Sequence, residues 1–275
     1  MTAGELLEAV ILGIVQGIAE FLPVSSSGHL VICSDLITHF TGKPFDPEAS
    51  LQMNVALHAG TLLSIVLVYR YDLMRMALRP KSWWPVLIAT APLVLIALTP
   101  VKDMLEEIST PLVAGFCLLF TSVLLFLSSR FGNEQASETL EIENEVTPVK
   151  AAVIGLFQAL ALLPGISRSG STITSALFMG VSRPIAAQFS FMIAIPAISG
   201  ATVLMVKDYL EASESEQTAP LAVLAVGAIV SFGVGLFALK WLIRIVSRGK
   251  LHYFGWYCLV VGTLTILWKL YERFA

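Results

Sequence analysis

Charged residues are scarce in this chain. Asp, Glu, Lys and Arg make up 13% of its 275 residues, whereas a soluble globular domain carries about 25%. Hydrophobic residues make up 56%, and the mean hydropathy is +0.80. This balance excludes an ordinary soluble enzyme and a disordered chain, and it indicates a core that forms in lipid. The 17 basic and 20 acidic residues give a net charge of −3, without the basic stripe that nucleic acid requires.

Cysteine is also scarce. Cys33, Cys117 and Cys258 stand far apart in apolar stretches, which argues against a disulfide framework and against a zinc site. The first ten residues contain no Lys or Arg but do contain Glu5 and Glu8. This is the opposite of the basic start of a signal peptide, so we expect the membrane segments to be permanent.

Long apolar runs are abundant. A membrane-spanning helix needs about 20 predominantly apolar residues, and the uncharged runs that approach this length are 49–69, 82–101, 108–129, 184–206, 219–239 and 251–268. Two further apolar regions, 6–40 and 149–182, are interrupted by Pro, Ser and Gly residues. The sequence therefore predicts an all-α polytopic membrane protein with six transmembrane helices and two re-entrant helical hairpins.

The basic residues orient this prediction, because cytoplasmic loops carry an excess of Lys and Arg. Segments 70–81 and 240–250, with Arg130 and Lys150, contain ten basic residues, whereas the alternate loops and the C-terminus contain four. Placing the first group in the cytoplasm puts both termini outside and makes the two hairpins enter from opposite faces. This is an inverted-topology repeat, with repeats of about 1–132 and 148–275 joined by an acidic cytoplasmic loop, 133–147.

Internal similarity supports the repeat. A shift of 142 residues aligns five identical residues of the first hairpin with the second. The aligned pairs are Gly13 with Gly155, Gln16 with Gln158, Ser25 with Ser167, Ser27 with Ser169, and Gly28 with Gly170.

The two breaks concentrate polar residues. Gln16 and Glu20 are four residues apart, so they share a face of a helix that Pro23 ends. Ser25 to Ser27 then provide the turn and the N-cap of a second half-helix. The second hairpin repeats this plan, since a helix ends at Pro164–Gly165 and another begins at 167–169.

Two half-helix N-termini that point at one cavity form an anion site, because their free N–H groups and positive dipole ends converge. Arg168 adds a planar fork that suits bidentate phosphate contacts. The hydroxyl groups can hydrogen-bond the remaining phosphate oxygens. The predicted ligand is phosphorylated, and the predicted phosphate contacts are Ser25, Ser27, Ser167, Ser169 and Thr172.

Glu20 would repel a phosphate unless a cation lies between them. Mg²⁺ typically binds through one or two carboxylates and the phosphates of the substrate, so Glu20, with Gln16 assisting, is a predicted ligand of a divalent cation. Alternatively, Glu20 acts as a general base. A structural ion pair between Glu20 and Arg168 is a third interpretation.

Ser26 and His29 are three residues apart and would share a face of the second half-helix. A nucleophile and its base need hydrogen-bond reach, so this spacing predicts a nucleophile–base pair. The alternatives are that the serines are only caps and turns and that His29 is a buried histidine with a structural partner.

These motifs carry a resemblance to a known family. The run Leu22-Pro-Val-Ser-Ser-Ser-Gly-His29 after Gln16 and Glu20, and the run Pro164-Gly-Ile-Ser-Arg-Ser-Gly-Ser-Thr172, resemble those of the undecaprenyl-pyrophosphate phosphatases, the bacitracin-resistance proteins of bacterial plasma membranes. The resemblance covers essentially the whole chain. Gln16 stands where other members carry Glu, which leaves Glu20 as the sole carboxylate of that motif.

The resemblance implies hydrolysis of undecaprenyl pyrophosphate to undecaprenyl phosphate and inorganic phosphate, which recycles a lipid carrier for peptidoglycan synthesis. It implies dependence on Mg²⁺ or Ca²⁺ and a site that opens to the outer face of the membrane, and it is compatible with a homodimer.

Mapped onto the residues, Ser26 is the predicted nucleophile, with Ser27 as the weaker choice, and His29 or Glu20 accepts its proton. Arg168 and the amides of 167–169 bind the phosphate and stabilise the transition state. A water activated by the metal or by His29 is an equally economical nucleophile.

The rival hypothesis is a transporter of lipid phosphates, since inverted repeats with broken helices are a transporter plan. A transporter needs no nucleophile–base pair, and a cation-coupled one would be expected to carry a second acidic residue within its spans. The six predicted spans contain none.

Overall fold

The computed structural model describes residues 3–42, 51–131, 141–211 and 220–274, and over these residues the chain is helical without β-strands. The helices are α1 (Ala3–Ala19), α2 (Ser26–Thr41), α3 (Leu51–Val68), α4 (Arg70–Leu78), the 3₁₀-helix η1 (Pro80–Trp83), α5 (Trp84–Ala97), α6 (Val101–Glu107), α7 (Pro111–Ser128), α8 (Ile142–Glu145), α9 (Pro148–Leu160), α10 (Arg168–Phe178), α11 (Arg183–Glu211), α12 (Leu221–Ser247) and α13 (His252–Phe274). Most of the predicted acidic loop, 133–140, lies outside the described residues.

Both interrupted regions are broken where the sequence predicts. In the first, α1 ends at Ala19 before Pro23, and α2 begins at Ser26. In the second, α9 ends at Leu160 before Pro164, and α10 begins at Arg168. Proline disfavours helical conformation in the residue before it, and the serines that follow can cap a new helix. The turns are therefore determined locally by the sequence.

Four helices are long and apolar enough to cross a membrane: Pro111–Ser128, Arg183–Lys207, Leu221–Ser247 and His252–Phe274. A fifth candidate is α3 with α4, which are bent by 73° at Tyr69. The predicted span 82–101 corresponds to a shorter apolar helix, Lys81–Ala97. The structure thus supports a multi-pass helical membrane protein with four or five candidate spans, against the six predicted.

The outer surface is unusually apolar. Large side chains such as Leu87, Phe237 and Leu264 are 61–71% exposed, although extended apolar surface on a soluble monomer is uncommon. The interior instead contains many hydroxyl groups, and every residue from Ser169 to Leu177 of α10 is buried. This distribution fits a molecule whose outer surface contacts lipid.

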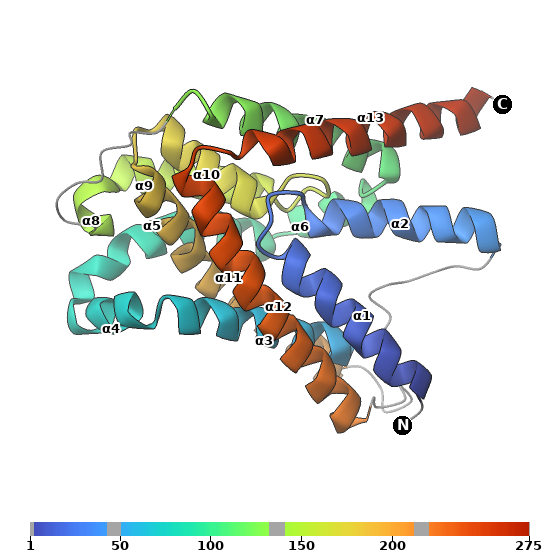
Figure 1. Cartoon of the computed structure of the whole chain (residues 1–275), viewed down its shortest axis with the longest axis horizontal. Coiled ribbons are helices and arrows are strands. Elements are labelled where there is room, and N and C mark those ends of the chain that lie inside the picture. The colour runs from blue at the N-terminus through green and yellow to red at the C-terminus, as the bar shows by residue number, and fades with distance from the viewer. Residues whose placement is uncertain (1–2, 43–50, 132–140, 212–219, 275) are drawn as a thin grey trace.

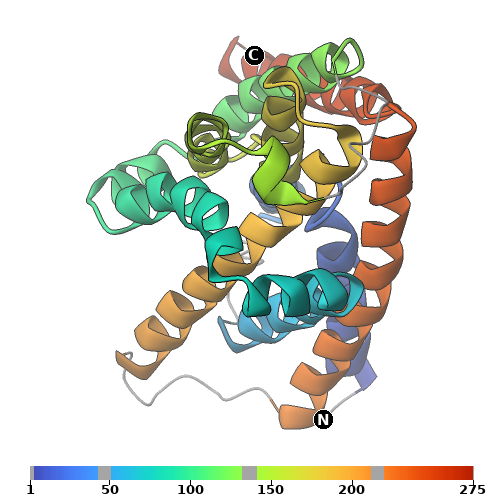
Figure 2. The same cartoon turned by 90° about the vertical axis from the view of Figure 1, so that its left-hand side faces the viewer.

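The helices pack around α10 and the first half of α11. Figure 2 shows α11 running diagonally through the molecule with α12 along one side. The most extensive helix pairs are α7 with α13, α3 with α12, α1 with α12, and α5 with α9. Both labelled chain ends lie at the right of Figure 1, and α4 and α8 lie at the left.

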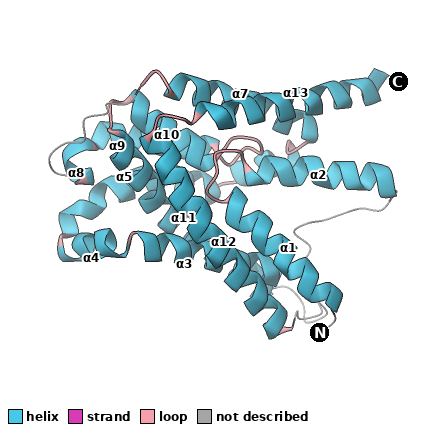
Figure 3. Ribbon diagram, viewed as in Figure 1, coloured by secondary structure: helices cyan, strands magenta, loops and turns pink. Residues whose placement is uncertain are grey.

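The two broken turns lie in the interior. Figure 3 shows loop segments between the helices near the start of α2, in the middle of the molecule. The contact between the two turns is made by glycines, since a Cβ at Gly28 would lie 2.6 Å from the backbone of Gly165. Small residues let backbones approach in this way within membrane proteins.

This contact predicts that Gly28→Ala pushes the hairpins apart. Because the obstructing atoms are backbone, we expect a loss of about 1–3 kcal/mol in stability and a lower melting temperature in detergent. Gly233→Ala is the matched control, since it is also a helical glycine and nothing lies within 4 Å of its added Cβ. Equal melting temperatures for the two variants would contradict the close approach.

Candidate functional site

The two turns are joined by one serine hydroxyl. Ser25 Oγ accepts a hydrogen bond from the amide of Gly28 at 3.3 Å, as the N-cap of α2. It also accepts one from the amide of Gly165, in the other turn, at 3.1 Å. A single side chain therefore caps its own helix and fixes the second turn against the first.

Thr121 of α7 holds the second turn from the other side. Its hydroxyl donates to the Gly165 carbonyl at 2.8 Å and accepts from the Ser167 amide at 3.2 Å. Gly165 has a φ of +97°, a conformation that glycine adopts without steric cost. The Gly165 amide and carbonyl and the Ser167 amide are thus bonded to protein, as a turn inside a membrane would require.

A polar cavity of about 180 Å³ lies where the turns meet. It is lined by Ala19, Glu20, Ser25, Ser26, Ser27, Ala161, Ile166, Ser167, Arg168 and Ser169. Seven of the ten predicted site residues are among these, brought together from both hairpins. Gln16, His29 and Thr172 do not line the cavity, but each is hydrogen-bonded to a residue that does.

Two helix N-termini face this cavity. Helix α2 begins at Ser26 and α10 at Arg168, which the 142-residue shift makes equivalent positions. Within the described residues, the amides of Ser26, Ser27, Arg168 and Ser169 donate to no protein acceptor. Free amides and the positive ends of two helices make the cavity attractive to an anion.

Glu20 and Arg168 form a direct ion pair. Arg168 Nη2 lies 2.5 Å from Glu20 Oε1, and the two side chains are 19% and 9% exposed. The second carboxylate oxygen, Oε2, accepts from Gln16 Nε2 at 2.9 Å. The structure thus contains the ion pair that the sequence left as one of three interpretations.

The ion pair bears on the repulsion expected between Glu20 and a phosphate. A guanidinium has five N–H donors, and a single Arg168 nitrogen contacts Glu20. Arg168 can therefore neutralise the carboxylate and still bind a phosphate. A bridging cation is not required to reconcile Glu20 with a phosphorylated ligand.

Few side chains in this region could act as ligands of a divalent cation. The described residues contain no group of three or more His, Cys, Asp or Glu side chains that could hold a metal. Around Glu20 the further donors are the amide of Gln16 and the imidazole of His58, whose Nε2 lies 3.8 Å from Glu20 Oε2. This set fits a cation that takes most of its ligands from water and substrate phosphates.

His29 is not hydrogen-bonded to Ser26, so the predicted nucleophile–base pair is not formed. Its Nδ1 lies 2.7 Å from the Ser25 carbonyl and its Nε2 lies 2.9 Å from the Tyr257 hydroxyl. Both ring nitrogens are therefore engaged, one by the Ser25 carbonyl four residues earlier and the other by a side chain of α13. The Ser26 hydroxyl has no hydrogen-bond partner in the described part of the chain.

The other serine hydroxyl groups of the cavity form two sets, the helix caps and their neighbours. Ser25 and Ser167 are N-caps of α2 and α10, as the capping interpretation expects. Ser27 and Ser169 lie 3.4 and 3.3 Å from these caps, oxygen to oxygen. A capping hydroxyl still has its own proton to donate, so phosphate contact by these serines stays a prediction.

Thr172 lies one turn behind Arg168. Its hydroxyl donates to the Arg168 carbonyl at 2.8 Å and lies 2.5 Å from Ser190 Oγ of α11. It supports the start of α10 and is buried away from the cavity.

Thr121, His58 and Tyr257 are not among the site residues predicted from the sequence. Each lies on a separate helix and reaches the site across a long stretch of sequence, 228 residues in the case of Tyr257 and His29. No local motif marks these residues, so only the tertiary structure reveals them.

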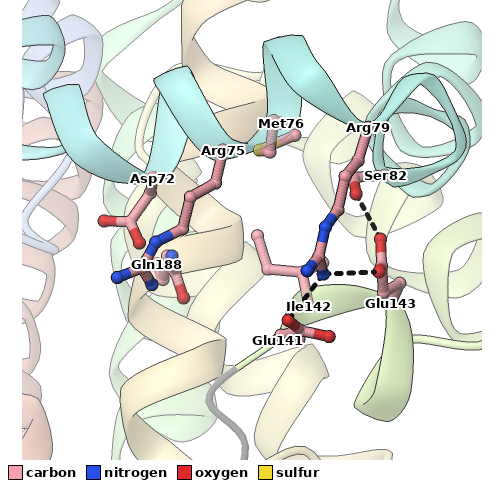
Figure 4. A pocket seen from close by; sticks show the side chains of 9 residues that line it. All are labelled: Asp72, Arg75, Met76, Arg79, Ser82, Glu141, Ile142, Glu143 and Gln188. Atoms are coloured by element: carbon pink, nitrogen blue, oxygen red, sulfur yellow. Dashed lines mark hydrogen bonds and ion pairs between the residues drawn. The ribbon is translucent and has the colours of Figure 1, made fainter.

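A second polar cavity, of about 50 Å³, lies between α4 and α8 (Figure 4). There Arg79 contacts Glu141 at 2.7 Å and Glu143 at 3.8 Å, and Ser82 donates to Glu143. Arg79, which is 60% exposed, thus pairs with two carboxylates. This cluster ties α8 to η1, and its hydroxyl group, that of Ser82, already donates to Glu143.

The chain is similar to known proteins over almost its whole length. The family model described as Bacitracin resistance protein BacA matches residues 9–264, which include both turns. A Rhodopirellula baltica protein named undecaprenyl-diphosphatase is 43% identical over 267 residues, covering 97% of this chain and 99% of that protein. Proteins of the same name from Alkaliphilus metalliredigens and Lacticaseibacillus paracasei are 37% and 35% identical, each covering 96% of this chain and 98% of the relative.

The buried ion pair makes a testable prediction. Arg168→Met leaves Glu20 without its cation, so we expect a loss of about 3–5 kcal/mol in stability. Adding Glu20→Gln removes the uncompensated charge, and most of that stability should return. Thermal melting of the wild type, both single variants and the double variant gives the coupling energy. Additive effects would contradict a direct pair.

Proposed function

This chain belongs to the bacitracin resistance protein BacA family, and on that premise we propose that it hydrolyses undecaprenyl pyrophosphate to undecaprenyl phosphate and inorganic phosphate. It is a membrane-bound phosphatase that recycles a lipid carrier for cell-wall synthesis, and the activity accounts for the bacitracin resistance in the family description. One observation carries the proposal. Two half-helix N-termini, an arginine and a free serine hydroxyl converge on one polar cavity.

The cavity suits the terminal phosphate of such a substrate. The four free amides and the unused N–H groups of Arg168 are donors for its oxygens. Phosphoryl transfer places charge on these oxygens, so preorganised donors stabilise the transition state. The apolar chain of the substrate stays in the membrane, and hydrophobic helices surround the cavity.

We propose Ser26 as the nucleophile. Its oxygen attacks the terminal phosphorus, and the bond to the bridging oxygen breaks, which releases undecaprenyl phosphate. Water then cleaves the phosphoserine and releases inorganic phosphate. Glu20 lines the same cavity, so of the two predicted bases it is better placed than His29 to accept the serine proton. Direct attack by water, with Glu20 as base and Ser26 as a binding group, is the alternative.

A divalent cation, Mg²⁺ or Ca²⁺, is proposed as the cofactor. Glu20 and Gln16 would hold it together with the substrate. A bound cation would neutralise phosphate charge and favour departure of the leaving group. The roles assigned above to Arg168 and Ser26 do not depend on it.

We further propose six transmembrane helices and two re-entrant hairpins in an inverted repeat of about 1–132 and 148–275. The helix order supports this, since α1, α2, α3, α5 and α7 correspond to α9, α10, α11, α12 and α13 at a shift near 142 residues. The contacts between helices follow the same correspondence. Helix α1 packs on α12 as α9 packs on α5, and α3 packs on α12 as α11 packs on α5.

The proposed location is the bacterial plasma membrane, with both termini outside and the site open to the outer face. Figure 1 supports the placement of both termini on one side, because they lie at the end opposite α4, whose segment 70–81 carries four of the predicted cytoplasmic basic residues. A homodimer, with which the family resemblance is compatible, stays a prediction.

The function predicts phosphate release from undecaprenyl pyrophosphate by the purified full-length protein in detergent. Arg168→Ala should lower kcat/KM by at least about 100-fold, because it removes donors to the transition state. Ser26→Ala should abolish release if the serine is the nucleophile. Release that survives in Ser26→Ala but not in Arg168→Ala would favour attack by water. A folded wild type that releases no phosphate with any divalent ion would refute the phosphatase and favour a lipid-phosphate transporter.

The cofactor proposal has its own test. EDTA should abolish phosphate release, and added Mg²⁺ or Ca²⁺ should restore it. Mn²⁺ binding, followed by electron paramagnetic resonance in the absence of substrate, should weaken at least about tenfold in Glu20→Gln, since that change removes the one carboxylate of the site. Full activity in EDTA would rule out the cation without affecting the assignment of Arg168.

A further inference from the structure

The backbone of Ser25 is strained. Its φ is 65° and its ψ is 97°, and it is the one non-glycine residue with positive φ in the described part of the chain. A side-chain-bearing residue persists in such a conformation only when its surroundings hold it there, and such residues cluster at functional sites.

The repeat provides an internal comparison. Ser167 is the equivalent N-cap of α10, and its φ of −75° and ψ of 124° are ordinary extended values. Both serines accept a hydrogen bond from the glycine amide three residues later. Capping by itself therefore does not require the strain, which is specific to the hairpin that carries Ser26.

A two-residue chain of side-chain hydrogen bonds ends on the Ser25 carbonyl, which also accepts from the His29 amide at 3.3 Å. His29 Nδ1 lies 2.7 Å from the Ser25 carbonyl, and His29 Nε2 lies 2.9 Å from the Tyr257 hydroxyl. A carbonyl oxygen only accepts, so the Nδ1 atom carries a proton. In the neutral ring Nε2 then accepts, and the Tyr257 hydroxyl donates. The two rings lie nearly parallel, with an angle of 12° between their planes.

The relaxed hairpin lacks this chain. The residue equivalent to His29 under the 142-residue shift is Ser171. Its buried hydroxyl has no hydrogen-bond partner in the described residues. The hydrogen-bond chain and the strain thus occur together in the first hairpin and are absent together from the second.

We propose that Tyr257 is a positioning residue of the phosphate site, acting through His29 on Ser25. The Ser25 carbonyl and the Ser26 N–H belong to one planar peptide and point in opposite directions. Holding the carbonyl against His29 therefore fixes the direction of the Ser26 amide and the start of α2. This inference rests on the proposed function, because the positioned groups are the nucleophile and its neighbouring amides.

The kinetic test is Tyr257→Phe, which removes one hydroxyl and keeps the ring. We expect kcat for phosphate release to fall about tenfold or more, because slight misplacement of reacting groups is costly, while KM changes less than about twofold. Tyr253→Phe is the matched control, since Tyr253 lies one turn earlier on α13 and is 57% exposed. The control should retain wild-type kcat. An unchanged kcat in Tyr257→Phe would overturn the proposal.

A spectroscopic test does not depend on activity. The chain contains four histidines, so ¹⁵N-labelled histidine gives few signals, and His29→Asn identifies that of His29. The wild type should show neutral His29 protonated at Nδ1. Tyr257→Phe should lose this single tautomer, and Tyr253→Phe should keep it. Wild-type His29 protonated at Nε2 alone would overturn the proposal. A wild type that shows the expected tautomer but releases no phosphate would instead count against the proposed function.

Discussion

The structure depends on satisfying broken-helix backbone inside an apolar molecule. Lipid offers no hydrogen-bond partners, so the turns at residues 20–25 and 161–167 must find theirs within the protein. Ser25 Oγ accepts from both turns, and Thr121 holds the second turn from α7. Glycines 28 and 165 let the two backbones meet. The same arrangement leaves the first amides of α2 and α10 free, so the proposed anion site follows from the way the turns are closed.

Electrostatics then determines what the site can hold. The free amides and Arg168 make the cavity positive, and Glu20 balances that charge within a 2.5 Å ion pair. Because Arg168 has further donors, the pair can bind a phosphate without a cation between carboxylate and ligand. The 142-residue shift aligns Ser26 with Arg168, at the starts of the two half-helices. Equivalent positions in the two hairpins thus carry different chemical groups, a hydroxyl and a guanidinium.

Much of the fold could be predicted from the sequence because its causes are local. Proline, glycine and serine mark both helix breaks, and long apolar runs mark the longest helices. The helix within the predicted span 82–101 is shorter than the apolar run, because apolar composition continues past the point where the helix ends at Ala97. Seven of the ten predicted site residues line the cavity, since they belong to the two turns themselves. The predicted bond between Ser26 and His29 is absent, because spacing along a helix gives proximity but does not exclude competing partners.

The sequence by itself therefore determined the helical class, the two breaks and the residue types that gather at them. These properties follow from backbone conformation and from transfer of side chains into lipid, which act over a few residues. Only the tertiary structure decided the partners: Glu20 with Arg168, His29 with Tyr257 of α13, and Gly165 with Ser25 of the other hairpin. Such contacts join residues 140 or more positions apart. They arise from the packing of whole helices, which no local pattern encodes.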